Sequence, residues 1–229
     1  MEGLDKKLLL FDIDGTLLTS GGAGERALRL GFRDRFGIDD DLQTIEIAGR
    51  TDSGIGRRML AAHGLPETPE NLASLFDGYL HFLAEELPVS PGHLLPGVVA
   101  LLEVLKKRPD IVLALLTGNL ARGAQLKLTH YGVWDYFEFG AYADYHYDRN
   151  ELGHFARERA EEKHGIEFPP QHIFVLGDTP HDIACARAIG ARAVAIATGK
   201  FSMAELGVYS PDYLFADFGD VPAVLEIFH

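Results

Sequence analysis

The chain has 229 residues, of which 47% are hydrophobic and 24% charged, enough for one large domain or two small ones with a buried core. Its 34 acidic and 21 basic residues give a formal net charge of −13, which argues against nucleic acid or an anionic membrane as a partner. Cys185 is the single cysteine, and no apolar run has the length of a signal peptide or a membrane span, so we expect a cytoplasmic protein without a disulfide.

Four short apolar runs predict the strands of a parallel sheet. Each has the length of a strand and is too uniformly apolar for a half-exposed antiparallel strand. The runs are residues 8–11, 111–116, 173–176 and 193–197.

Segments with the apolar spacing of helices lie between and after these runs. They are residues 98–107, 121–131, 151–164, 182–189 and 221–228. Strands that alternate with helices imply right-handed crossovers. We therefore predict an α/β fold with a doubly wound parallel sheet, a Rossmann-like core.

Residues 21–95 interrupt this alternation directly after the first strand. The interval is mostly helical by pattern, at residues 24–36, 52–63 and 69–86. The stretch "LPVSPGHLLPG" then leads back to the sheet with three prolines. We predict a small helical domain at 21–95 inserted into a core formed by 1–20 and 96–229.

Polar residues follow three of the predicted strands. Asp12 and Asp14 come after the first, the triplet Thr117-Gly118-Asn119 after the second, and Asp178 with Asp182 after the third. In an open parallel sheet, ligands bind beyond the carboxyl ends of the strands. The sequence therefore predicts one site that gathers carboxylates, a hydroxyl and open backbone amides.

This combination suits phosphoryl transfer. Asp12, Asp178 and a backbone carbonyl near Asp14 offer the oxygen ligands that Mg²⁺ prefers. Asp12 is the candidate nucleophile, which would form an aspartyl phosphate, and Asp14 is the candidate general acid and base. The Thr117 hydroxyl and the Gly118 and Asn119 amides are candidate donors to phosphate oxygens.

The motifs "DIDGT", "TGN" and "GDTPHD" together resemble those of the haloacid dehalogenase superfamily of phosphohydrolases. The insertion is similar to that of members with a small helical cap, and "GDTPHDIACARAIGARAVAIATG" is similar to phosphoglycolate phosphatase-like members. The resemblance implies that the cap closes over the active site and selects the substrate. The dehalogenases lack an aspartate at the position of Asp14, so its presence here favours phosphate ester hydrolysis.

Three further residues have two readings each. The resemblance implies a lysine that bridges the nucleophile and the phosphate. We assign this role to Arg149, the only base between residues 134 and 152. The alternative is that Arg149 is a solvated arginine at the start of a helix. Asp182 either holds Arg149 or a metal-bound water from behind, or only caps a helix. Arg50, in "AGRTDSGIG", either contacts substrate from the cap or lies on the surface.

These features predict a Mg²⁺-dependent phosphatase of small organic phosphate monoesters, such as phosphoglycolate-like compounds or sugar phosphates. The expected partner is a small phosphorylated metabolite, and the expected state is a monomer or a small homo-oligomer. Two alternatives stay open. One is a phosphomutase of the same fold, and the other is a catalytically silent, phosphate-binding regulatory module.

Overall fold

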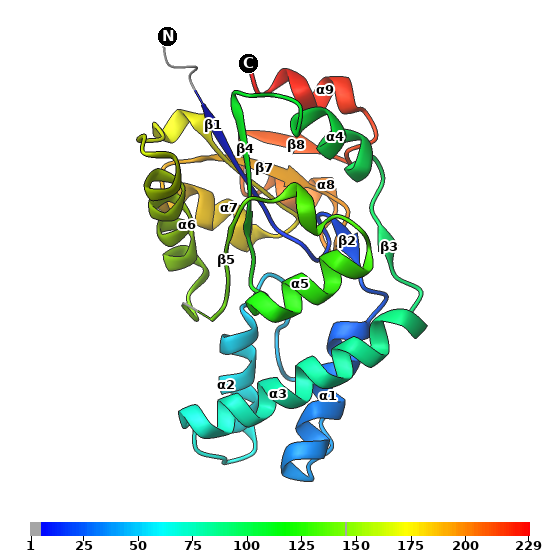
Figure 1. Cartoon of the computed structure of the whole chain (residues 1–229). Helices are drawn as coiled ribbons and strands as arrows, with labels where there is room; N and C mark the ends of the chain where they lie inside the picture. Colours follow the sequence, from blue (N-terminus) through cyan, green and yellow to red (C-terminus); the bar gives the residue numbers. More distant parts are fainter. Residues whose placement is uncertain (1–5, 145) are drawn as a thin grey trace.

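The computed structural model describes residues 6–144 and 146–229, so the first five residues of the predicted core lie outside the described part. Its centre is a parallel sheet with the strand order β5-β4-β1-β6-β7-β8 (Figure 1). The strands are β1 (Lys7–Phe11), β4 (Ile111–Leu116), β5 (Gly140–Ala141), β6 (Ile173–Gly177), β7 (Arg192–Ile196) and β8 (Tyr213–Phe215). The predicted parallel α/β fold is confirmed.

Helices cover both faces of the sheet. On β1, Leu9 and Phe11 face one apolar cluster, while Leu8 and Leu10 face the other. The first cluster includes residues of α4 (Val98–Leu105), α5 (Ala121–His130) and α9 (Val221–Glu226). The second includes residues of α6 (Arg149–His164), α7 (Pro180–Ala188) and α8 (Met203–Gly207). Because both faces are buried, the central strands read as uniformly apolar runs.

Three helices form a separate group beyond the carboxyl ends of the strands, at the bottom of Figure 1. They are α1 (Ala23–Phe36), α2 (Asp52–Ala62) and α3 (Pro69–Glu86). They share a third apolar cluster that includes Phe32, Met59 and Leu75. We call this group the cap. The exact limits 21–95 stay a prediction.

Two chain segments connect the cap to the core. They contain the short strands β2 (Leu18–Thr19) and β3 (His93–Leu94), which pair antiparallel. Arg26 on α1 lies beside both segments: its guanidinium donates to the Gly21 carbonyl at 3.0 Å and also contacts Glu86 and Ser90. The cap and the core are thus joined by a pair of adjacent strands with one arginine across them.

The remaining elements are short 3₁₀ turns at Leu87–Val89, Trp134–Tyr136 and Pro170–His172. Among the described residues, no helix is both long and apolar enough to span a membrane.

Candidate active site

The first strand delivers Asp12 into the centre of the sheet's carboxyl edge. The Asp12 amide still donates to the Leu176 carbonyl at 2.9 Å, so the residue keeps the register of the β1–β6 pairing. The chain then turns at Gly15, whose φ of +83° lies in the left-handed region. A Cβ on Gly15 would lie 2.4 Å from the carboxylate of Asp178, which follows β6, so this turn requires glycine where it passes that side chain.

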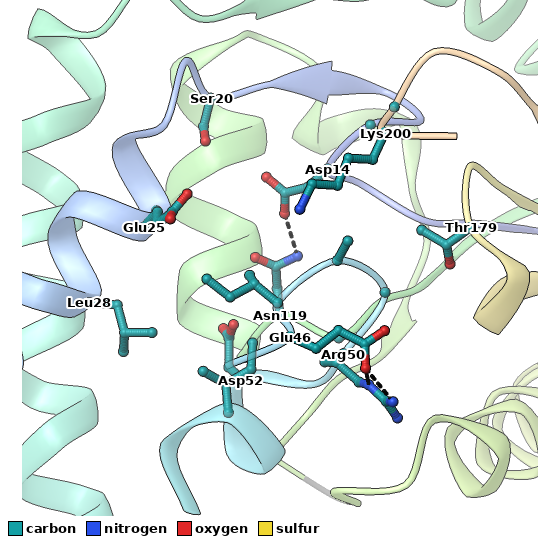
Figure 2. Close-up of a pocket in the computed structure, with 18 of the residues that line it drawn as sticks. Asp14, Ser20, Glu25, Leu28, Glu46, Arg50, Asp52, Asn119, Thr179 and Lys200 are labelled. Atoms are coloured by element: carbon teal, nitrogen blue, oxygen red, sulfur yellow. Dashed lines mark hydrogen bonds and ion pairs between the residues drawn. The ribbon is translucent and has the colours of Figure 1, made fainter. Parts of the chain in front are cut away.

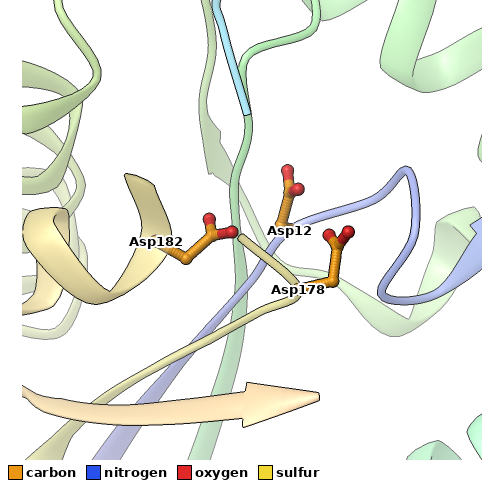
Figure 3. Close-up of side chains that lie close together, drawn as sticks. All are labelled: Asp12, Asp178 and Asp182. Atoms are coloured by element: carbon orange, nitrogen blue, oxygen red, sulfur yellow. The ribbon is translucent and has the colours of Figure 1, made fainter. Parts of the chain in front are cut away.

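Asp12, Asp178 and Asp182 form a buried cluster (Figure 3). One carboxylate oxygen from each lies within 4.8 Å of the others. Burial raises the pKa of Asp12 to about 6, although the Arg149 guanidinium acts in the opposite direction. Burial and the charges of Asp182 and Asp12 raise the pKa of Asp178 to about 8. The protein groups around the cluster therefore do not fully stabilise its carboxylates in their ionised form.

Arg149 is the one cation in direct contact with this cluster among the described residues. It is the first residue of α6, and its side chain is 8% exposed. The guanidinium nitrogen Nη2 lies 3.1 Å from Asp12 Oδ1 and also donates to Asp182 Oδ1. The structure thus places Arg149 beside the candidate nucleophile, and the alternative of a solvated helix-start residue is wrong.

Asp182 combines both roles that the sequence left open. Its Oδ2 accepts hydrogen bonds from the Thr179 amide at 2.9 Å and the Thr179 hydroxyl at 2.7 Å, which completes a capping box at the start of α7. Its Oδ1 accepts from Arg149. Both oxygens are therefore engaged by protein donors, so Asp182 fixes Arg149 from behind.

Asp12 and Asp178 suit a divalent cation better than Asp182 does. The Asp178 carboxylate accepts one hydrogen bond, from the Thr16 hydroxyl at 3.2 Å, and Asp12 has the Arg149 contact. Two raised carboxylate pKa values in one buried cluster are the condition that a bound cation relieves. The Asp14 side chain lies outside the cluster, so a contribution of this residue to an ion through its backbone carbonyl stays a prediction.

The loop after β4 presents polar groups next to Asp12. The Thr117 side chain is fully buried, and its Oγ1 accepts from the Asn119 side-chain amide at 2.8 Å. Because that oxygen is the acceptor, its own O–H is left to donate elsewhere. The structure brings Thr117, Gly118 and Asn119 to the same edge as the acids, as the strand-end argument predicts.

Sequence reasoning missed Lys127, a residue of α5 that is only 4% exposed. Its ammonium donates to Asp14 Oδ2 and to Asn119 Oδ1, each at 2.7 Å. A signal was present: Lys127 shares a helix face with the apolar pair Ala124 and Leu128, where a lysine requires a partner.

The cap covers this edge, and an open cavity of about 580 Å³ lies between the two (Figure 2). The start of α2 in the cap lies directly on the loop that follows β4: the Asp52 amide donates to the Gly118 carbonyl at 2.6 Å, and the Leu120 amide donates to Asp52 Oδ2 at 2.9 Å. Burial raises the pKa of Asp52 to about 6, with the Lys127 charge opposing it. The cavity wall includes Asp12, Asp14, Asn119, Arg149 and Asp178 from the core and Glu25, Glu46, Arg50, Asp52 and Tyr79 from the cap.

Arg50 lines the cavity from the cap side, as predicted. Its guanidinium Nε donates to Glu46 at 2.9 Å, and Glu46 also lies 3.4 Å from the His181 ring on α7. Arg50 is therefore held in a cap-to-core chain of contacts at the cavity wall. Whether it contacts a substrate stays a prediction.

Comparison with known proteins agrees with this geometry. Residues 9–187 match the family model described as haloacid dehalogenase-like hydrolase, so the chain belongs to that family and is a hydrolase by class. It is 27% identical over 224 residues to a probable phosphatase, IndB, of Dickeya dadantii, covering 94% of this chain and 92% of that protein. It is 28% identical over 219 residues to a phosphoglycolate phosphatase of Vibrio vulnificus, covering 91% of each.

Solved structures show the same fold. A hydrolase from Pseudomonas syringae superposes with a TM-score of 0.73 at 22% identity, covering 96% of this chain and 98% of that one. A CbbY mutant from Rhodobacter sphaeroides, in complex with xylulose-(1,5)-bisphosphate, superposes with a TM-score of 0.74 at 19% identity, covering 94% and 96%. These structural likenesses cover 94–96% of the chain. The predicted family is confirmed by the family model that matches residues 9–187.

Proposed function

We propose that the protein is a Mg²⁺-dependent phosphatase of small organic phosphate monoesters that works through an aspartyl-phosphate intermediate. The observation that carries this proposal is the buried Asp12–Asp178 pair. It lies against Arg149, and the cavity beneath the cap is lined by both acids together with Gly118 and Asn119 of the loop that follows β4. A candidate nucleophile, a counter-charge and candidate phosphate donors thus border one cavity.

In the first half-reaction, a carboxylate oxygen of Asp12 attacks phosphorus and the bond to the leaving oxygen breaks. Asp14 gives its proton to that oxygen, so the leaving group departs as an alcohol. In the second, Asp14 takes a proton from water, the water oxygen attacks phosphorus, and the bond to Asp12 breaks. The products are the alcohol and inorganic phosphate, and the enzyme returns to its starting state, with Asp12 as a carboxylate and Asp14 protonated.

The other residues hold the phosphoryl group during both steps. Arg149 stabilises negative charge beside Asp12, and the Thr117 hydroxyl with the Gly118 and Asn119 amides donates to phosphate oxygens. These donors are fixed before charge moves, which makes them more effective than water. Asp12, Asp178 and the Asp14 carbonyl would hold Mg²⁺, which, when bound, neutralises the carboxylates and polarises a phosphate oxygen.

The substrate is a small phosphorylated metabolite, phosphoglycolate-like or a sugar phosphate. The size of the cavity and the similar proteins support this class: one is a phosphoglycolate phosphatase, and one structural neighbour was solved with a bisphosphate sugar. We further propose a cytoplasmic protein that acts as a monomer or a small homo-oligomer. Asp14 beside the cavity favours hydrolysis over a silent phosphate-binding module, because such a module needs no acid.

The test is phosphate release from a panel of phosphorylated metabolites and from an aryl phosphate, with Mg²⁺ and after exhaustive chelation. We expect hydrolysis with Mg²⁺, little without it, and none for the Asp12→Asn variant, because an amide is not a nucleophile. Full activity after chelation contradicts the metal assignment, and near-normal turnover by Asp12→Asn contradicts the covalent route. Isomerised sugar phosphate without free phosphate identifies a mutase.

A further inference from the structure

The buried Lys127 has no part in the mechanism above, yet it touches the acid/base residue. Of its three ammonium donors, two are assigned by hydrogen bonds: one to Asp14 Oδ2 and one to Asn119 Oδ1, both at 2.7 Å. Burying a lysine is costly unless its charge is paired and hydrogen-bonded, and both conditions are met here. The pairing partner, Asp14, is itself 40% exposed by side chain and borders the cavity.

Lys127 also determines the orientation of Asn119. An ammonium group only donates, so the amide must turn its oxygen towards Lys127. The Asn119 nitrogen Nδ2 then faces the other way and donates to Asp14 Oδ2 at 2.8 Å and to Thr117 Oγ1 at 2.8 Å. Lys127 therefore orders a hydrogen-bonded group that includes the Asp14 carboxylate and, through Asn119, the Thr117 hydroxyl.

The two donors converge on the same oxygen of Asp14. Oδ2 accepts from both Lys127 and Asn119, whereas no hydrogen bond reaches Oδ1 from the residues that the structure describes. A half-exposed aspartate side chain can adopt several orientations. Two fixed donors on one oxygen favour a single orientation of the Asp14 carboxylate. The other oxygen is thereby kept for the proton that passes to the leaving group.

The cap contributes to the burial of Lys127. A Cβ on Gly24 of α1 would come within 3.5 Å of the lysine nitrogen and within 3.9 Å of the Tyr79 hydroxyl of α3. The cap acid Asp52 is close enough for the Lys127 charge to oppose the rise in its pKa that burial causes. The lysine ammonium is therefore enclosed between the two parts of the molecule, while Asp14 borders the cavity.

We propose that Lys127 is a positioning residue for the acid/base Asp14: with Asn119 it fixes one carboxylate oxygen so that the other faces the leaving group. The inference rests on the proposed phosphatase function and deepens it. Lys127 differs from Arg149, which contacts the nucleophile Asp12 and not Asp14. The two cations thus serve different carboxylates of the same site.

The first test compares Lys127→Met, which keeps length and removes charge, with Lys127→Arg, which restores charge and donors. On an alkyl phosphate we expect Lys127→Met to lower kcat by about 10- to 100-fold with KM changed less than about threefold, a part of the usual contribution of general acid–base catalysis. Lys127→Arg should recover part of the loss. Lys107→Met, at an exposed lysine, is the matched control and should behave as the parent.

The leaving group gives a second readout. An activated aryl phosphate needs no proton on its leaving oxygen, so Lys127→Met should release the first equivalent of phenol at nearly the parent's rate in a single turnover. The slow step is then attack of water on the phosphoryl enzyme, which also needs Asp14. A burst followed by slow turnover supports the proposal. Equal slowing of the aryl burst and of the alkyl reaction contradicts it.

A double-variant comparison separates positioning from a purely structural role. If Lys127 acts through Asp14, then Asp14→Asn combined with Lys127→Met should be no slower than Asp14→Asn alone. If the rate loss of the double variant is the product of the two single losses, the proposal is wrong. It is also wrong if Lys127→Met raises KM and leaves kcat unchanged. If Lys127→Met does not fold, Lys127→Gln enters the same comparison. A parent enzyme that hydrolyses no phosphate ester defeats the proposed function itself, which no outcome at Lys127 can do.

Discussion

Arg149 makes its two carboxylate contacts through a single nitrogen. Nη2 lies 3.1 Å from Asp12 and also donates to Asp182, while its Nε is buried without a hydrogen-bond partner among the described residues. The rigid fork of a guanidinium is therefore only half used within the protein. A buried donor without a partner is uncommon and costs free energy, so this Nε is an unsatisfied polar group within the site.

Replacing this residue should expose the charge balance of the site. Arg149→Ala leaves Asp12 and Asp182 buried without their cation, so we expect kcat/KM to fall at least 100-fold and stability to fall by about 3 kcal/mol. Arg149→Lys keeps one charged nitrogen, which is what the Asp12 and Asp182 contacts need, and should restore a large part of both. Steady-state kinetics and thermal unfolding measure these effects.

Arg157 provides the control for that experiment. It lies on the same helix, α6, and pairs with Glu161 at 2.9 Å near the surface. Arg157→Ala should leave activity unchanged. An Arg149→Ala enzyme as active as the parent would assign the role of the family's bridging lysine to another base.

The pH dependence of stability should follow Asp178. Burial, with the charges of Asp182 and Asp12, raises its folded pKa from 3.8 to about 8. A carboxyl with a raised folded pKa binds its proton more tightly in the native state. Its stabilising contribution is therefore complete below about pH 4 and is lost as the pH rises through about 8.

A divalent cation replaces the proton in this balance. We expect the melting temperature of the ion-free protein to fall between pH 5 and pH 8 relative to Asp178→Asn, whose amide does not titrate. Added Mg²⁺ should raise the parent's melting temperature more at pH 8 than at pH 5.5. An equal increase at both pH values, or the same pH profile in Asp178→Asn, contradicts this assignment.

At the scale of elements, the strand predictions worked because burial on both faces leaves no polar alternation. The run 111–116 is exactly β4, and the other three runs agree with β1, β6 and β7 to within one residue at each end. Strands β5 and β8 were missed, since β5 has two residues and β8 is only partly buried. The five-residue α8 also lies below the length at which a helical period is visible.

The candidate site was predictable to the extent that its residues follow strands. Asp12, Thr117 and Asp178 each come at a strand end, where topology alone brings them together. Lys127 lies in the last turn of a helix, and its neighbours Asp14 and Asp52 come from segments 113 and 75 residues earlier. These contacts depend on how α5 packs against the loop after β1 and, for Asp52, on how the cap meets the core, which no local pattern contains.

The contact between the cap at Arg50 and the loop that follows β4 requires a glycine at position 118. A Cβ on Gly118 would lie 2.2 Å from the Arg50 carbonyl oxygen. Gly118→Ala should therefore push the cap loop away from the core and open the cavity. We expect kcat/KM for a metabolite to fall about tenfold or more, with a smaller loss on an aryl phosphate.

Gly123→Ala is the comparison variant for that prediction. Gly123 lies in α5 beside the same interface, but a Cβ there would meet Leu80, Leu83 and Tyr79 only at ordinary contact distances of 3.7 to 3.8 Å. Kinetics with both substrates should leave Gly123→Ala close to the parent. If Gly118→Ala is also unchanged, the loop contact is not needed for closure.

For the whole molecule, the net charge of −13 poses the question of how an anionic substrate is held. Four cations line the cavity among the described residues. Three of them lie beside a carboxylate, Arg149 with Asp12, Lys127 with Asp14 and Arg50 with Glu46, and the fourth is Lys200. Arg149 and Lys127 are buried, so their local fields are only weakly screened by solvent. The net negative charge of the protein therefore weakens the long-range attraction of an anionic substrate more than it weakens binding of that substrate in the cavity.

The insertion of helices after the first strand gives the last prediction. The sheet edge carries the proposed phosphate contacts, whereas the cavity's other wall comes from the cap, with Arg50 in it. If the cap selects the substrate, Arg50→Ala should change the ranking among phosphorylated metabolites far more than it changes activity on an aryl phosphate.

Arg58→Ala, at an exposed cap arginine on α2, is the control and should change neither measure. The paired strands β2 and β3, with Arg26 across the two connections, are the place where such a cap would hinge. Closure over a cavity of about 580 Å³ admits a metabolite but not the surface of a macromolecule, so a folded phosphoprotein should be a poor substrate. An identical loss on every substrate would place Arg50 in the phosphate site or in folding, and efficient dephosphorylation of the phosphoprotein would refute a closing cap.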